Sequence, residues 1–258
     1  MEELLWWQYG LIALIFVWSG FVRSGLGFGG AALALPFLLL VLNEPLIFLP
    51  LVAVQLLIFS SWIAFQGYRK NRKQKDNTES NIDWRYLKYA LSIIIVPKMI
   101  GILGLLTLPS DIMTAIIFFI VSIYAISYIL NKPFKSDKPY LDILFLIIGG
   151  YFSGASLIGA PLIVAVFATK VAKHQLRDTL FILWFILVVI KMTSFLITGI
   201  DLQLIHHLWL LPCAFIGHLM GQAFHEKIQK AETPVFFRVL GVSLLFICIV
   251  GIYSTFQA

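Results

Sequence analysis

Residues 24–30 read SGLGFGG and lie between two apolar runs. They contain the spacing G-x-G-x-x-G, at Gly25, Gly27 and Gly30, which in soluble enzymes holds the pyrophosphate of a dinucleotide. A dinucleotide site needs a short strand before the glycines and a helix with a polar face after them. The sequence indicates neither, so we expect these glycines to serve another purpose.

The composition is typical of an integral membrane protein. The chain is 60% hydrophobic and 12% charged, with a mean hydropathy of +0.93, whereas about 25% of the residues of a soluble domain are charged. The acidic start Met1-Glu2-Glu3 does not predict a removable signal peptide. We predict an all-α polytopic protein in the lipid bilayer of a bacterial inner membrane, with about 8–10 hydrophobic segments, near 4–22, 24–42, 45–67, 84–106, 111–130, 140–155, 157–171, 176–198, 203–224 and 234–256.

The basic residues predict the orientation in the membrane. The one long polar connection, 68–83, is rich in Lys and Arg, and such residues stay on the cytoplasmic side. Placing it inside also puts the basic connections 131–139 and 224–233 inside, and leaves the outer connections without Lys or Arg. Both termini are then outside. The net charge of +6 therefore reflects topology and predicts no nucleic-acid partner.

An internal repeat supports this topology. The stretch at 24–33 is matched by SGASLIGAPL at 153–162, half a chain length later, and Lys98 and Gly101 are matched by His218 and Gly221. We predict two inverted-topology repeats, 1–130 and 140–258, joined by the cytoplasmic linker 131–139. Each would open with a broken helix or helical hairpin, and such transporters bind their substrate between the repeats.

The duplicated glycine and serine pattern predicts an anion site. We expect each Ser-Gly-x-small motif to break a helix and expose the first N–H groups of the next helix, which attract anions. Packing is the alternative, because small residues such as Gly217 and Gly221 also let membrane helices approach closely.

Two lysines are predicted deep in the membrane. Lys98 lies roughly 13 Å from the outer end of its segment, near the middle of a ~30 Å hydrocarbon layer, and Lys191 is about as deep. The acidic residues near the segments, such as Asp111, Asp142 and Asp178, fall at segment ends, so we expect an anionic substrate to compensate the lysines. Snorkelling toward the interface is the alternative for both lysines.

His218, Gln55 and Thr179 add weaker candidates. His218 could bind the anion or make a neutral interhelical hydrogen bond, and Gln55 and Thr179 could donate hydrogen bonds. Arg23 could line the site, but at a hairpin tip that faces inward it is more often one more cytoplasmic anchor. The predicted substrate-binding residues are Ser24, Gly25, Gly27, Gly29, Gly30, Ser153, Gly154, Ser156, Gly159, Lys98, Lys191, His218, Gln55 and Thr179.

No catalytic, metal or ATP-binding motif is indicated, so we predict neither an enzyme nor a cofactor. Cys213 and Cys248 fall in apolar runs, where a lone thiol is usually a small buried hydrophobe.

The stretches SGLGFGGAALALP (24–36) and GYFSGASLIGAPLIVAV (150–166) resemble the TauE/SafE family of sulfite and organosulfonate exporters. The resemblance covers nearly the whole chain and implies a G-x-x-G-G-G hairpin near the start with a degenerate second copy. That second copy has Ser156 and Ile158 where the first has Gly27 and Gly29, so the two hairpins are expected to contribute unequally.

The resemblance implies export of sulfite or an organosulfonate, whereas the residues alone predict only a secondary transporter of small anions. A carboxylate, phosphate or thiosulfate transporter and a non-transporting membrane assembly protein remain alternatives. Coupling to protons or sodium and assembly into a homo-oligomer are both left open.

Overall fold

The computed structural model describes residues 4–26, 30–73, 82–132, 134–136, 138–228 and 234–256. Within these ranges the chain forms helices and no strands, which confirms the all-α prediction. The helices are α1 (Trp6–Leu26), α2 (Gly30–Val41), α3 (Pro45–Lys73), α4 (Trp84–Thr107), α5 (Ser110–Ile129), α6 (Pro139–Ser156), α7 (Ala160–Lys170), α8 (Lys173–Ile197), α9 (Leu204–Ile228) and α10 (Pro234–Thr255).

Six helices have the length and apolar composition to cross a membrane, counting described residues only. They are α4, α5, α6, α8, the part of α9 up to Ala223 and the part of α10 from Arg238. Large apolar side chains such as Phe119, Leu208 and Phe246 are more than 60% exposed on the outside of the bundle. An apolar surface of this extent fits contact with lipid chains, and the fold is that of a polytopic membrane protein.

The helix limits follow from local chemistry as well as from apolar length. At the start of α4, the Asp83 carboxylate accepts a 2.9 Å hydrogen bond from the backbone N–H of Tyr86, as an N-cap residue does. After α5 and α8 the chain turns through Asn131 (φ 51°) and Gly199 (φ 70°), in the left-handed conformation that commonly ends a helix.

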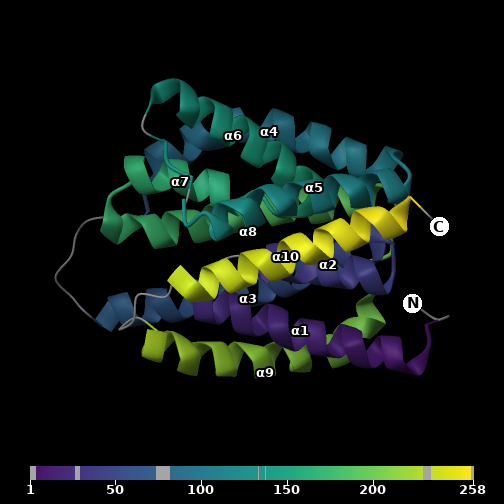
Figure 1. Ribbon diagram of the computed structural model, residues 1–258. Coiled ribbons are helices and arrows are strands. Elements are labelled where there is room, and N and C mark those ends of the chain that lie inside the picture. The colour runs from purple at the N-terminus through teal and green to yellow at the C-terminus, as the bar shows by residue number, and fades with distance from the viewer. Residues whose placement is uncertain are drawn as a thin grey trace.

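The helices pack mainly in pairs that join the two halves of the sequence. Helix α1 packs along α9, α4 along α6, and α5 along α10, while α3 contacts α8. Figure 1 shows the α1–α9 pair and the α4–α6 pair on opposite flanks, with α3, α5, α8 and α10 between them. Both termini lie at one end of the bundle, and α9 ends and α10 begins at the other.

This pattern of neighbours is the one expected of two related sets of five helices. If α1–α5 correspond in order to α6–α10, the α1–α9 pair corresponds to the α6–α4 pair, and α5–α10 corresponds to itself. Each set also begins with a hairpin, α1–α2 and α6–α7, whose two helices touch. The opposite orientation of the two sets in a membrane stays a prediction.

Glycines bring the flanking pairs together. A Cβ atom added at Gly154 of α6 would lie 2.1 Å from the backbone oxygen of Lys98 in α4. One added at Gly217 of α9 would lie 1.8 Å from the backbone oxygen of Val17 in α1. Only glycine permits these backbone contacts, so close packing accounts for part of the glycine pattern.

Candidate anion-binding site

The second hairpin breaks after its serines, directly behind Ser156. Ser153, Gly154 and Ser156 belong to the last turn of α6, and the break falls at 157–159. Leu157 ends the helix in the left-handed conformation (φ 62°) and donates its N–H to the Ser153 oxygen at 3.2 Å. The expectation that Ser153 and Gly154 expose the N–H groups of a following helix therefore differs from the structure, which places them at a helix C-terminus.

The two deep lysines converge on this C-terminus. Lys98 of α4 donates from its Nζ to the Ser153 Oγ at 3.0 Å and to the Ser153 backbone oxygen at 3.4 Å. Lys191 of α8 donates from its Nζ to the Gly154 backbone oxygen at 2.6 Å. Both side chains are fully buried, with 0% exposure, so snorkelling does not describe them.

Carbonyl oxygens at a helix end explain how two lysines can be buried together. The last four carbonyls of a helix lack intrahelical partners and carry a partial negative charge of roughly half an electron. This compensates part of the lysine charge. Neither Lys98 nor Lys191 forms an ion pair with a carboxylate in the part of the chain that the structure describes. The cluster of Lys98, Lys191 and Ser153, called the lysine cluster below, therefore has N–H donors that a further acceptor can bind, and no carboxylate partner among the described residues.

The first hairpin has a corresponding polar contact. Ser24, in the last turn of α1, is hydrogen-bonded through its Oγ to the Nδ1 of His218 in α9. The predicted repeat matches Ser24 with Ser153 and His218 with Lys98. Each hairpin serine thus pairs with the deep nitrogen of a helix from the other half of the chain.

Arg23 is buried beside this contact. It is 8% exposed, its Nη1 donates to the backbone oxygen of Gln55 at 3.1 Å, and its guanidinium carbon lies 4.6 Å from the centre of the Phe59 ring. The Phe59 ring is also 5.2 Å from the His218 ring. A cytoplasmic anchor would be exposed at the surface, so the sequence-based expectation for Arg23 is wrong. Arg23 lies within α1, which continues to Leu26, rather than at the tip of the hairpin.

Two hairpin glycines among the predicted site residues serve helix packing. A Cβ atom at Gly159 would lie 2.1 Å from the Gly149 backbone oxygen, and one at Gly30 would lie 3.0 Å from the Ser19 backbone oxygen. Both contacts hold the two arms of a hairpin together. Gly25 belongs to the last turn of α1, while Gly27 and Gly29 lie outside the described residues.

The remaining predicted residues divide between the site and other positions. Gln55 is 1% exposed and contacts Arg23, whereas the Ser156 Oγ donates to the Phe152 backbone oxygen of its own helix at 2.9 Å. Thr179 belongs to α8, and its Oγ1 accepts a 3.0 Å hydrogen bond from the backbone N–H of Asp83, the residue before α4. The structure does not bring Thr179 to the lysine cluster.

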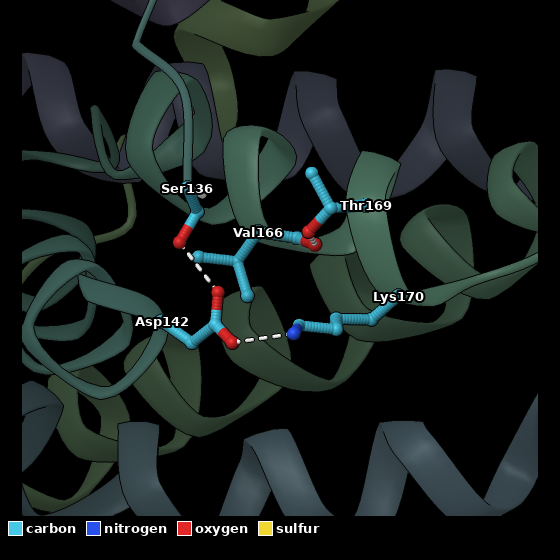
Figure 2. A network of polar contacts seen from close by, with 5 residues as sticks. All are labelled: Ser136, Asp142, Val166, Thr169 and Lys170. Carbon is cyan, nitrogen blue, oxygen red and sulfur yellow. Dashed lines mark hydrogen bonds and ion pairs between the residues drawn. The ribbon is translucent and has the colours of Figure 1, made fainter. Parts of the chain in front are cut away.

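A separate polar network closes the base of the second hairpin. Figure 2 shows Asp142, in the first turn of α6, paired with Lys170, in the last turn of α7. The Asp142–Lys170 distance is 2.8 Å, and Ser136 of the linker donates to the same carboxylate at 2.5 Å. Each charge also lies at the helix end whose dipole favours it. This network joins α6, α7 and the linker.

These features define a polytopic helical membrane protein with two polar clusters, one at the break of each hairpin. The family model for sulfite exporter TauE/SafE matches residues 12–253, nearly the whole chain. The chain belongs to the TauE/SafE sulfite exporter family, which confirms the resemblance seen in the sequence and makes the protein an integral multi-pass membrane protein of a transporter family. Searches of the curated proteins and of the solved structures return no match.

Proposed function

We propose that this protein is a secondary transporter that exports small sulfur oxyanions, sulfite or an organosulfonate, across a bacterial inner membrane. The observation that carries the proposal is the lysine cluster: two fully buried lysines whose described partners are a hydroxyl and two backbone oxygens. Family membership supports sulfur as the central atom and export as the direction.

The charge of the lysine cluster favours an anion over other solutes. An unpaired charge in the hydrocarbon layer costs about 2.5–3.5 kcal/mol even on insertion scales, so a cavity and a counter-charge are needed. A carboxylate would serve a cation transporter, and none pairs with these lysines in the described chain. A small oxyanion can accept the remaining ammonium protons of Lys98 and Lys191.

The packing of helices from one half of the chain against helices from the other half supports alternating access. The hairpin of each half rests against a helix of the other half, α1 on α9 and α6 on α4. Rocking of one flanking pair against the other would open a site near the hairpin breaks to one side of the membrane and then to the other, as in other repeat-built transporters. The coupling ion, a proton or sodium, stays open in this proposal.

Binding by lysine variants tests the role of the cluster. Lys98→Met and Lys191→Met should each abolish sulfite binding at the lysine cluster of the purified protein, because they remove the charge and the donors while leaving an apolar chain of similar length. Lys88→Met is the matched control, since Lys88 lies on α4 but is exposed. Isothermal calorimetry with sulfite, sulfoacetate, taurine, thiosulfate, sulfate and phosphate would measure both the loss and the preference.

Normal sulfite binding by both Met variants would show that the lysines only cap α6. Preference for phosphate or a carboxylate would keep the mechanism and remove sulfur from the proposal. A folded wild-type protein that binds none of these anions would favour the assembly protein instead.

Labelling of single cysteines tests the orientation, which we propose with both termini outside. In intact cells, a membrane-impermeant maleimide should label Asp201→Cys and spare Lys135→Cys, because the basic linker is expected to be cytoplasmic. The reverse pattern would overturn the orientation.

A further inference from the structure

Arg23 and Gln55 form a second polar cluster, between α1 and α3, that the lysine cluster does not include. Both side chains are more than nine-tenths buried, at 8% and 1% exposure. No ion pair joins Arg23 to a carboxylate among the described residues. A guanidinium is charged at neutral pH, so this part of the first hairpin carries a positive charge.

Two nitrogens of this cluster have no hydrogen-bond partner among the described residues. In the described part of the chain, the Arg23 Nε and the Gln55 Nε2 are buried donors without a hydrogen bond. The other contacts of the two side chains are made: Arg23 Nη1 donates to the Gln55 backbone oxygen at 3.1 Å, and the Ser19 Oγ lies 3.4 Å from the Gln55 side-chain oxygen. Buried polar groups are nearly always paired, and leaving a donor unpaired is costly.

The geometry fixes which side of the guanidinium is free. Phe59 covers its face, with the ring centre 4.6 Å from the guanidinium carbon, and Gln55 occupies Nη1. What remains is the edge that carries Nε. The edge of a guanidinium presents parallel N–H groups that match two oxygens of one oxyanion, and an amide N–H can bind a third.

The neighbouring groups that the structure describes add hydrogen-bond donors and no carboxylate. The residue after Arg23 is Ser24, whose hydroxyl is hydrogen-bonded to His218. The His218 ring and the Arg23 guanidinium both contact the ring of Phe59. A serine, a histidine, an arginine and an amide therefore gather at the end of α1. This composition suits an anion with several oxygens.

We propose that Arg23 and Gln55 form a second oxyanion site, which takes the three oxygens of sulfite or of a sulfonate group. It rests on the proposed function, because it assumes that the transported anion is the ligand. The lysine cluster offers point charges, whereas the N–H groups of the guanidinium edge and of the amide match the positions of oxygens in an oxyanion. The first hairpin thus selects oxyanions over chloride, and the protein holds one anion at each hairpin.

Counting bound sulfite tests the proposal. Equilibrium dialysis of the purified full-length protein with ³⁵S-sulfite should find two ions per chain. Arg23→Lys keeps the positive charge but removes the parallel N–H groups of the guanidinium edge. Gln55→Leu removes the amide donor and keeps a side chain of similar volume. In each variant one of the two ions should bind tenfold or more weakly, the loss expected when one charge-assisted hydrogen bond is removed. Arg85→Lys, an exposed change on α4, is the matched control and should still bind two.

A competition with chloride gives a second readout. Chloride should displace sulfite more readily from Arg23→Lys than from the wild type. Gln55→Leu keeps the test valid if Arg23→Lys does not fold, since Gln55 carries no charge. A wild type that binds a single sulfite ion, unchanged in affinity in both variants, would overturn the second site and leave the proposed function standing. A wild type that binds no sulfite would overturn both.

Discussion

Gly154→Ala tests whether the lysine cluster depends on the close approach of α4 and α6. The added Cβ would lie 2.1 Å from the Lys98 backbone oxygen and 3.1 Å from the Gly101 Cα. Because these are backbone atoms, no side chain can turn aside. The helices must separate by about 1.2 Å for a carbon–oxygen contact to reach ~3.3 Å.

Two effects of Gly154→Ala lower the free energy of unfolding, and one raises it. Overpacking of this kind costs about 1–3 kcal/mol. The 3.0 Å bond from the Lys98 Nζ to the Ser153 Oγ would be stretched, and a hydrogen bond to a charged group contributes about 1.5–3 kcal/mol. Alanine is favoured over glycine within a helix by about 1 kcal/mol. The net destabilisation is therefore about 1.5–5 kcal/mol, with loss of sulfite binding at the lysine cluster.

Gly104→Ala on α4 is the matched control, because the nearest atom to its Cβ would be the Leu108 Cδ1 at 3.8 Å. It should be neutral or stabilised by up to about 1 kcal/mol. Unfolding of both variants in detergent, followed by circular dichroism, and sulfite calorimetry would compare them. The reasoning fails if Gly154→Ala is as stable as Gly104→Ala and binds sulfite as the wild type does.

Two further predictions concern other parts of the fold. Gly217→Ala should destabilise the α1–α9 pair, since its Cβ would lie 1.8 Å from a backbone oxygen, whereas Gly10→Ala, with no atom within 4 Å, should not; equal melting temperatures would contradict this. Asp142→Asn should lower stability by about 1–2 kcal/mol, a modest value because the Lys170 side chain is 38% exposed. In a double-mutant cycle with Lys170→Met, a coupling energy near zero would show that the pair does not hold the hairpin.

The helices were largely predictable because a bilayer requires apolar runs of about 20 residues. The expected 84–106 and 234–256 became α4 (Trp84–Thr107) and α10 (Pro234–Thr255). The order of small residues also predicted that each half opens with a hairpin. A sequence of this kind fixes how long a segment is and which face is apolar, and these properties decide the fold.

The helix breaks were harder to predict from the same residues. Serine and small residues can end a helix or begin one, so the motif at Ser153 did not reveal that its carbonyls, not its N–H groups, would meet the lysines. The left-handed turn at Leu157 sets the break, and leucine carries no signal for that conformation. The same uncertainty of a few residues concealed the burial of Arg23.

Contacts between the halves needed three-dimensional information. The predicted repeat matched His218 with Lys98 and Ser24 with Ser153, but such a match does not say which residues touch. The pairing of Ser24 with His218, and of Ser153 with Lys98, arises because each hairpin packs on a helix of the other half. Thr179 was predicted as a site residue because its helix follows a hairpin. The sequence did not indicate that it would instead bond to the backbone of Asp83.

Sulfite transport by the reconstituted protein tests the central claim most directly. Proteoliposomes loaded with unlabelled sulfite should accumulate external ³⁵S-sulfite by exchange when they contain the wild type or Lys88→Met. They should not do so with folded Lys98→Met or Lys191→Met. Exchange of sulfite at wild-type rates by both of these variants, or wild-type vesicles that exchange a neutral or cationic solute and no sulfur oxyanion, would contradict the account.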